Sequence, residues 1–307
     1  MKTKTWTALL AVYIIWGSTY LGIHFAIETI PPFMHAAVRF LLAGSLLFIW
    51  RRSAGDPAPT RGHWRAAAIV GLLLILGGNG LISWAEQTIP SGIAALLVST
   101  IPMFMVLVEA LRPGGTRPGW AQIFGLLMGF GGVALLIGPD AFGGADRLNP
   151  VGVAVALVAA FLWSLGSIYQ RGAQLPKSIL IFTGMEMLAG SLGLFVMSAA
   201  SGEFAHFNMA AVSMRSLLGL GYLVTFGSLV GFVAYGWLLR NAPVRLVATY
   251  PYVNPLVAIL LGAWLAGEGL SLRTLLAAAV IIGAIVLITQ VKTPAGIAEN
   301  EPAEELA

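Results

Sequence analysis

Two stretches of the sequence decide its fold class. Residues 84–102 read WAEQTIPSGIAALLVSTIP, and residues 237–255 read WLLRNAPVRLVATYPYVNP. A shift of 153 positions places one on the other, and one tryptophan and two prolines then coincide: Trp84 with Trp237, Pro90 with Pro243, and Pro102 with Pro255. The chain therefore carries a repeat whose unit is about half its length.

Two further matches extend the repeat on either side of these stretches. Gly17–Tyr20 resembles Gly166–Tyr169 at a shift of 149 positions, and Gly131–Leu136 resembles Gly283–Ile288 at a shift of 152. The matches occur in the same order at a nearly constant offset. The repeat therefore covers most of the chain.

Composition limits what such a repeat can be. Of the 307 residues, 58% are hydrophobic and 10% are charged, whereas a soluble domain has about 25% charged residues. The mean hydropathy is +0.87. These values exclude an ordinary soluble enzyme and a disordered protein, and they indicate a polytopic membrane protein. The absence of cysteine excludes disulfides, thiolate metal sites and cysteine catalysis.

Apolar runs of about 20 residues, each long enough to cross a bilayer, alternate with short polar breaks. They predict ten helices, at about residues 5–26, 31–50, 64–85, 91–110, 119–138, 150–170, 178–199, 215–239, 245–266 and 272–291. The first run is expected to be an uncleaved span. The polar tail 292–307 is expected to be disordered and cytoplasmic.

The positions of lysine and arginine predict the orientation of these spans. With the N-terminus in the cytoplasm, only Arg147, Arg215 and Arg273 fall outside and Arg39 lies within a span, which leaves the other 13 of the 17 basic residues inside. Both termini are therefore expected in the cytoplasm of a bacterial cell, with the chain in the inner membrane.

Each half contains five predicted spans, over residues 1–138 and 150–291. Because five is odd, the second half must enter the membrane from the opposite side. The predicted fold is an all-α membrane protein with ten transmembrane helices, arranged as a five-plus-five inverted-topology repeat. This architecture is typical of secondary transporters that work by alternating access.

Motifs for chemistry are missing from the sequence. It has no phosphate-binding loop, no zinc-binding H-E-x-x-H and no G-x-S-x-G elbow, and its four histidines lack metal-ligand spacing. We expect no enzyme activity, no cofactor, no metal and no nucleic-acid partner. The expected partners are a small-molecule substrate and the lipid bilayer. We expect a monomer, with a dimer as the alternative.

Polar and aromatic stripes mark two equivalent helices. Trp16 and Tyr20 lie on one face of the first predicted span, and Trp163 and Ser167 lie on one face of the sixth. Such stripes fit either helix packing or the wall of a cavity. The position of Trp163 in the middle of its span favours a cavity, because tryptophans that anchor a helix lie at the membrane interface.

Prolines are expected to interrupt two spans. Pro102 and Pro255 occupy matching positions in the fourth and ninth spans, and Pro251 lies nearby. Proline cannot donate to the carbonyl four residues earlier, so that carbonyl must face protein or a wet cavity. Broken helices at symmetric positions favour a binding site in the middle of the membrane, with simple helix bending as the alternative.

Two charges are predicted to lie inside the bilayer. Arg39 and Glu186 occupy matching places about eight residues into the second and seventh spans, which is a depth of about 12 Å. They could form an ion pair, or each could be capped by nearby carbonyls and hydroxyls. We expect Arg39 to serve assembly more than substrate contact. Glu86 and Glu109, at the ends of spans, are expected to be solvated.

The ten spans, the stretches Trp16–Tyr20 and Val38–Gly44, and Gly267–Glu268 before the last span resemble the EamA family of the drug/metabolite transporter superfamily. The stretches Ser99–Pro102 and Leu111–Gly115 most resemble its YedA-type branch, which is related to YddG-type amino-acid exporters. The resemblance implies export of small metabolites, often amino acids and sometimes drug-like cations, through a central cavity.

Carried onto this chain, the resemblance and the stripes together give eleven candidate substrate-binding residues: Trp16, Tyr20, Asn79, Ser83, Ser99, Trp163, Ser167, Tyr235, Tyr250, Tyr252 and Asn254. The leading hypothesis is a secondary transporter that exports amino acids or similar compounds. A multidrug or organic-cation exporter is the first alternative. An intramembrane enzyme would need a catalytic cluster that the sequence does not show, and a channel would not need the broken, repeated helices.

Overall fold

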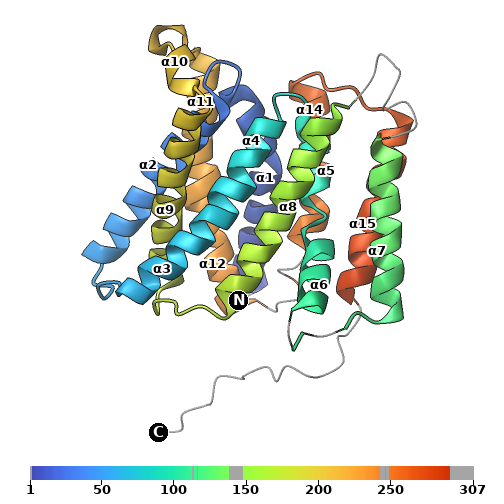
Figure 1. Cartoon of the computed structure of the whole chain (residues 1–307), viewed down its shortest axis with the longest axis horizontal. Coiled ribbons are helices and arrows are strands. Elements are labelled where there is room, and N and C mark those ends of the chain that lie inside the picture. The colour runs from blue at the N-terminus through green and yellow to red at the C-terminus, as the bar shows by residue number, and fades with distance from the viewer. Residues whose placement is uncertain are drawn as a thin grey trace, which may run out of the picture.

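The structure is a computed structural model, and it describes residues 2–112, 114–115, 117–137, 148–242, 246 and 249–290. Every regular element among these residues is a helix. The long helices stand side by side with their axes roughly along one direction (Figure 1). The predicted tail 292–307 lies outside the described residues.

The first half of the chain forms seven α-helices and one π-helical segment. Their bounds are α1 Lys2–Ala26, α2 Pro32–Ser53, α3 Arg61–Val70, η1 Gly71–Gly80, α4 Leu81–Ala85, α5 Ser91–Val98, α6 Ile101–Leu111 and α7 Trp120–Ile137. Because α3, η1 and α4 follow one another without a break, they make a single rod.

The second half repeats much of this order. Its elements are α8 Pro150–Arg171, α9 Ile179–Ala200, α10 Glu203–His206, η3 Met209–Ala211, α11 Met214–Tyr222, η4 Leu223–Val230, α12 Gly231–Asn241, α14 Tyr250–Leu265 and α15 Leu272–Gln290. The second π-helical segment, η4, again lies inside a continuous rod, between α11 and α12. Gly71 and Leu223, the first residues of the two π-helical segments, are 152 positions apart.

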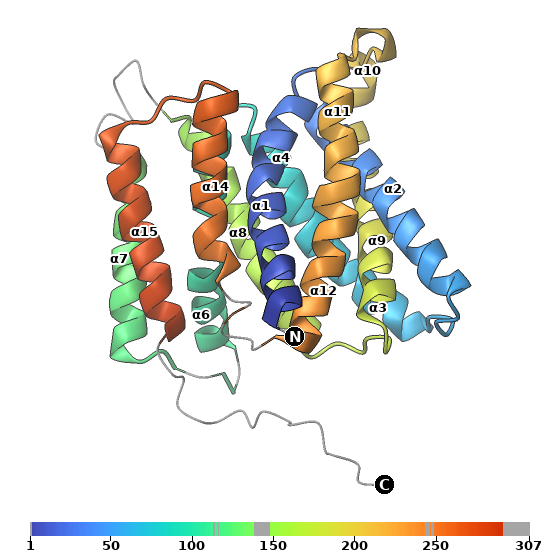
Figure 2. The same ribbon diagram turned by 180° about the vertical axis from the view of Figure 1, so that it is seen from behind.

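Eight helical rods among the described residues are long and apolar enough to cross a membrane, and Trp120–Leu136 and Tyr250–Leu265 are shorter apolar helices. The boundaries agree with the predicted ones to within a few residues; the predicted start of the ninth span at 245 lies outside the described residues, and α14 covers Tyr250–Leu265. The first residues of α1 and the last of α15 lie at the same end of the bundle (Figure 2).

The three prolines act differently from one another. A turn at Ser99 and Thr100 separates α5 from α6, and Pro102 lies in the first turn of α6. Pro251 lies in the first turn of α14, where a missing amide hydrogen costs nothing. Pro255 lies inside α14, which continues past it. The predicted break is therefore present in the fourth span. In the ninth span, residue 246 is helical, a turn lies at Thr249 and α14 begins at Tyr250, while residues 243–245 and 247–248 lie outside the described residues.

Two glutamates bind the N-termini of helices far away in sequence. Each follows a glycine with positive φ, Gly202 or Gly267. Glu203 accepts hydrogen bonds from the amides of Phe33 (3.1 Å) and Met34 (2.8 Å) at the start of α2. Glu268 accepts from the amides of Ser91 (2.7 Å) and Gly92 (3.1 Å) at the start of α5. A carboxylate satisfies the orphan amides there and complements the helix dipole.

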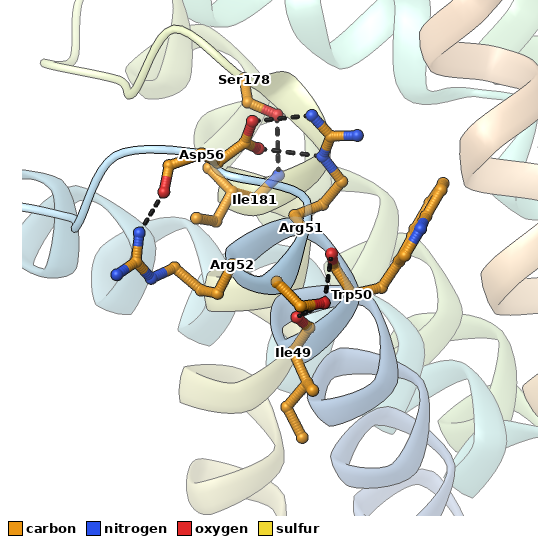
Figure 3. A network of polar contacts seen from close by, with 8 residues as sticks. Ile49, Trp50, Arg51, Arg52, Asp56, Ser178 and Ile181 are labelled. Carbon is orange, nitrogen blue, oxygen red and sulfur yellow. Dashed lines mark hydrogen bonds and ion pairs between the residues drawn. The ribbon is translucent and has the colours of Figure 1, made fainter.

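A related acid turn lies at the other end of α2. Gly55 has a positive φ, and Arg51 donates from Nε (2.9 Å) and Nη2 (2.7 Å) to the carboxylate of Asp56. Arg52 donates to the Asp56 carbonyl. Figure 3 draws this network together with Ser178, whose hydroxyl caps α9 by accepting from the amide of Ile181 (3.5 Å).

Glycines allow neighbouring helices to approach closely. A Cβ on Gly71 would lie 2.4 Å from the carbonyl oxygen of Glu186, and one on Gly190 would lie 2.4 Å from Cβ of Ile75. The rod of α3 and η1 therefore packs against α9 nearly backbone to backbone. Gly125 also lets α7 approach α15 closely, since a Cβ on it would lie 2.6 Å from Cγ1 of Ile288.

Candidate functional site

A cavity lies in the middle of the bundle and is bounded by both halves of the chain. Its volume, counted as the space open to the centre of a water molecule, is about 100 Å³. The lining residues come from α1, α2, η1, α4, α5, α6, α8, η4, α12 and α14, and they are Trp16, Thr19, Tyr20, Ile23, Arg39, Gly78, Asn79, Ile82, Val98, Ile101, Ala159, Ala160, Trp163, Gly227, Phe232, Tyr250 and Asn254.

An aromatic cluster around Trp16 forms one wall of the cavity. The Trp16 ring centroid lies 5.4 Å from that of Phe232, 5.0 Å from that of Tyr235 and 5.2 Å from that of Tyr250. The indole Nε1 donates to the carbonyl oxygen of Gly227 (3.3 Å). Edge-on and tilted contacts of this kind hold the rings in place. The ring faces that line the cavity are therefore fixed in position for contact with an apolar ligand.

Trp163 forms a second wall because η1 supplies glycine where the indole lies. A Cβ on Gly78 would lie 2.6 Å from Cε3 of Trp163, so a larger residue would push the ring away. The next residue, Asn79, donates from its side chain to the carbonyl oxygen of Leu74 (3.2 Å), five residues earlier. π-Helical turns are rare and are frequent at functional sites. Here η1 places a glycine and an amide at the cavity, and η4 places Gly227 there.

The interrupted fourth span contributes backbone to the cavity. Pro102 has no amide hydrogen to donate to the carbonyl of Val98, which lines the cavity together with Ile101. The hydroxyl of Ser164 on α8 donates to the Ile101 carbonyl oxygen (2.9 Å). On the opposite side, with its amide oriented to satisfy its neighbours, the Asn254 side chain donates to the carbonyls of Tyr250 (3.2 Å) and Tyr13 (3.3 Å).

The structure brings six of the eleven predicted residues to the cavity: Trp16, Tyr20, Asn79, Trp163, Tyr250 and Asn254. The other five do not line it. Tyr235 lies behind the wall against Trp16, and Tyr252 pairs with Thr289. The hydroxyls of Ser83, Ser99 and Ser167 donate to carbonyls of their own helices. Serine in a helix can satisfy itself in this way, and sequence alone does not reveal that choice.

Sequence reasoning missed the apolar part of the lining. Ile23, Ile82, Val98, Ala159 and Ala160 carry no polar atom in their side chains and resemble any other residue of an apolar span. Two lining glycines stand beside polar residues in otherwise apolar spans: Gly78 in the run Gly77–Gly80, which contains Asn79, and Gly227 before Ser228.

Arg39 lies in the cavity wall and is 4% exposed. Its Nε donates to the Ser228 hydroxyl (3.0 Å), and its Cζ lies 4.6 Å from the ring centroid of Phe40. Its terminal nitrogens donate no hydrogen bond to any described residue. Arg39 and Glu186, the two predicted intramembrane charges, do not form an ion pair. Arg39 is instead capped by a hydroxyl, as the second predicted arrangement has it. Glu186 is buried, and its Oε2 has no hydrogen-bond partner.

The expectation that Glu86 is solvated is wrong. Glu86 is 4% exposed, and neither carboxylate oxygen has a hydrogen-bond partner among the described residues. The reason is that the Glu86 side chain is covered by neighbouring helices, although the next residues, Gln87 and Thr88, are exposed. Ala85, the last residue of α4, is fully buried, and α4 packs against α8 and α2. Glu109, in contrast, is partly exposed, and its Oε2 lies 3.9 Å from Nη1 of Arg112.

These features define a class, that of polytopic helical membrane proteins with a cavity between two repeated halves. The chain belongs to the EamA-like transporter family, which it matches twice, over residues 4–138 and 150–290. It is therefore a multi-pass membrane transporter with two EamA repeats.

Curated relatives agree with this assignment. The chain is 40% identical over 283 residues to "Uncharacterized inner membrane transporter YedA" of Escherichia coli K12, covering 92% of this chain and 89% of the relative. It is 26% identical to "Uncharacterized transporter YvbV" of Bacillus subtilis, covering 99% and 98%, and 27% identical to "Protein PecM" of Dickeya dadantii, covering 90% and 89%. The match to YedA supports the resemblance to the YedA-type branch and an inner-membrane location.

The fold is shared with a solved structure. A chain described as "Crystal structure of protein" superposes with a TM-score of 0.61 at 21% identity, covering 94% of this chain and 96% of that chain. At this identity the likeness concerns the fold alone. It shows that the bundle with two halves is a packing that another sequence also adopts.

Proposed function

We propose that this transporter exports small amphipathic metabolites, amino acids or amino-acid-like compounds, across the inner membrane by alternating access. The observation that carries the proposal is the central cavity, whose walls combine aromatic rings, side-chain amides and one guanidinium from both halves of the chain. Rings and amides can hold an apolar side chain and a polar head together. The EamA family and the YedA-type relative support transport itself, and the substrate class and the direction are our inference.

The proposed topology has ten membrane crossings in two inverted repeats, with both termini in the cytoplasm. Its support is the direction of equivalent helices: α1 begins at the end of the bundle where α8 ends, and α7 begins at the end where α15 ends (Figures 1 and 2). The two π-helical segments at matching positions add to it. The shorter apolar helices of the fifth and ninth spans are compatible with ten crossings, because each packs against a long apolar helix: α7 against α15, and α14 against α1.

The proposal is tested by transport into and out of proteoliposomes. The purified chain is reconstituted, and counterflow of each of the radiolabelled proteinogenic amino acids is measured. We expect saturable flux of at least one amino acid with an apolar or aromatic side chain. The absence of flux for all of them, in protein that elutes as a single folded species, would contradict an amino-acid transporter.

Trp163→Ala tests whether the cavity is the transport site. Trp163 lines the cavity and lies on Gly78, so its removal should weaken substrate affinity by about tenfold or more. Trp264→Ala is a matched control, since Trp264 is 79% exposed on α14. Equal flux in both variants would place the transport path elsewhere.

An organic-cation or multidrug exporter is the second candidate. The observation in its favour is Glu86, a buried carboxylate one helical turn beyond Ile82 in the cavity wall. Ethidium efflux from loaded proteoliposomes separates the two proposals. Ethidium efflux without amino-acid counterflow would favour this alternative.

A further inference from the structure

The central cavity carries one charged side chain. Among the described residues that line it, Arg39 is the only acid or base, and the others are aromatic, aliphatic or uncharged polar residues. The cavity wall therefore offers a positive charge and no carboxylate. A charge inside a membrane bundle is costly unless acceptors surround it. The guanidinium of Arg39 thus needs acceptors, either from the protein or from a ligand.

The protein supplies an acceptor for only part of the guanidinium. Nε donates to the hydroxyl of Ser228 (3.0 Å), and Cζ lies 4.6 Å from the ring centroid of Phe40. The terminal nitrogens, Nη1 and Nη2, donate to no described residue. They also do not belong to the fully covered polar atoms that lack a partner, whereas both oxygens of Glu86 do. The end of the guanidinium is therefore open to the cavity, while the rest of the group is held in place.

Gly227 on η4 places this open end beside the aromatic wall. A Cβ on Gly227 would lie 3.2 Å from Nη2 of Arg39, so the missing side chain leaves room for the guanidinium. The carbonyl oxygen of the same glycine accepts from Nε1 of Trp16 (3.3 Å). All three residues line the cavity. The cavity thus presents a positive charge and an apolar ring at the same residue of η4.

We propose that Arg39 binds a carboxylate of the transported molecule, so that the cavity selects amphipathic organic acids, with or without an α-amino group. The inference rests on the proposed function and names the chemical group that its substrates share. A carboxylate has two oxygens in one plane, and it can accept two parallel N–H bonds from the end of a guanidinium. The apolar part of the molecule then lies along the rings around Trp16.

The charge of Arg39 also decides which molecules the cavity rejects. A carboxylate cancels the one charge in the wall, whereas an organic cation adds a second positive charge where little water separates the two groups. An amine without a carboxylate should therefore be a poor ligand. In this arrangement Ser228 is a positioning residue, because its hydroxyl binds Nε and so fixes the direction in which Nη1 and Nη2 point.

Three ligands with one carbon skeleton test the proposal. They are L-phenylalanine, 3-phenylpropanoate, which lacks the amine, and phenethylamine, which lacks the carboxylate. Binding to the purified full-length protein is measured by calorimetry. For the wild-type protein we expect both carboxylates to bind, and phenethylamine to bind about tenfold or more weakly than 3-phenylpropanoate, because it cannot accept from Arg39.

Two kinds of variant assign the carboxylate to Arg39. Arg39→Gln should weaken both carboxylates about 10- to 100-fold and leave phenethylamine unchanged, and Arg39→Lys should weaken them less, since lysine keeps the charge without the planar fork. Ser228→Ala keeps the arginine and should weaken both carboxylates about 2- to 10-fold. Ser191→Ala is its matched control, because Ser191 is fully buried on α9, away from the cavity, and bonds to Leu188 of its own helix (2.7 Å).

The outcomes separate this inference from the proposed function. Tight binding of phenethylamine by the wild-type protein, or an equal loss of all three ligands in Ser228→Ala, would overturn the role of Arg39 and leave amino-acid transport in place. Binding of 3-phenylpropanoate without counterflow of any amino acid would contradict the proposed substrate and support the carboxylate site. Where the Arg39 variants do not fold, Ser228→Ala and its control decide, and unchanged binding of both carboxylates in Ser228→Ala would then contradict the inference.

Discussion

Glu203 offers the most direct test of how this bundle is held together. Its carboxylate accepts three hydrogen bonds, from the amides of Phe33 and Met34 and from the hydroxyl of Ser198 (2.7 Å). It thereby ties the turn after α9 to the first turn of α2. Glu203→Ala should remove all three bonds and leave the buried start of α2 without a cap.

The size of the effect follows from these contacts. Loss of an N-cap costs about 1–2 kcal/mol, loss of the charge at the helix N-terminus about 0.3–1 kcal/mol, and an unpaired buried hydroxyl at Ser198 about 1 kcal/mol. Together they lower the free energy of unfolding by about 2–4 kcal/mol. For a chain of this length, about 1.5 °C of Tm per kcal/mol gives a decrease of about 3–6 °C.

The assay is thermal unfolding of the detergent-purified protein, followed by tryptophan fluorescence. Glu28→Ala is the matched control, because Glu28 forms an exposed ion pair with Arg215 (3.0 Å), which is worth about 0–1 kcal/mol. Glu203→Gln keeps one acceptor oxygen and should fall between the two. A Tm for Glu203→Ala equal to that of Glu28→Ala would refute the assignment of Glu203 as a helix cap.

Three other substitutions test the close packing. Gly71→Ala places a Cβ 2.4 Å from the Glu186 carbonyl oxygen and should lower the free energy of unfolding by about 2–3 kcal/mol. We expect a lower yield of monodisperse protein in size-exclusion chromatography. Gly131→Ala, whose Cβ meets open space, is the control and should leave the yield unchanged. Gly231→Ala places a Cβ 2.4 Å from Nε1 of Trp16. It should displace that indole and lower the affinity for substrate in counterflow, and Gly221→Ala, where nothing lies within 4 Å, serves as its control. Gly190→Ala should lower the yield as Gly71→Ala does, since its Cβ would lie 2.4 Å from Cβ of Ile75; a normal yield in both would contradict backbone contact between α3–η1 and α9.

The positions of the helices could be predicted from sequence because each crossing needs a long apolar run. The run 91–110 predicts one span, and the structure divides it at Ser99 and Thr100 as the proline suggests. The effect of Pro255 could not be predicted, because a helix interrupted by proline and one that continues past it have the same sequence signature.

The candidate site shows a similar division. Aromatic stripes led to Trp16, Tyr20 and Trp163, since rings at helical spacing in mid-span are unusual for residues that face lipid. Side chains that can satisfy themselves within a helix, as Ser83 and Ser167 do, gave no such guidance. The burial of Glu86 depends on which neighbours cover the end of α4, which is tertiary information that no local pattern contains.

The contacts made by the two glutamate caps bear on how the protein can move. Glu203 joins the end of α9 to the start of α2, and Glu268 joins the end of α14 to the start of α5. In both cases the acid lies in the second family repeat and the helix that it caps lies in the first. Gly125 in α7 and Ile288 in α15 make the same kind of connection. The two sequence repeats are consequently not two separate bodies that could move as rigid units. Any rocking motion must divide the molecule along a seam that crosses both repeats, with partners such as α2 and α9 travelling together. A chain cut between the repeats should therefore yield two fragments that need each other to fold.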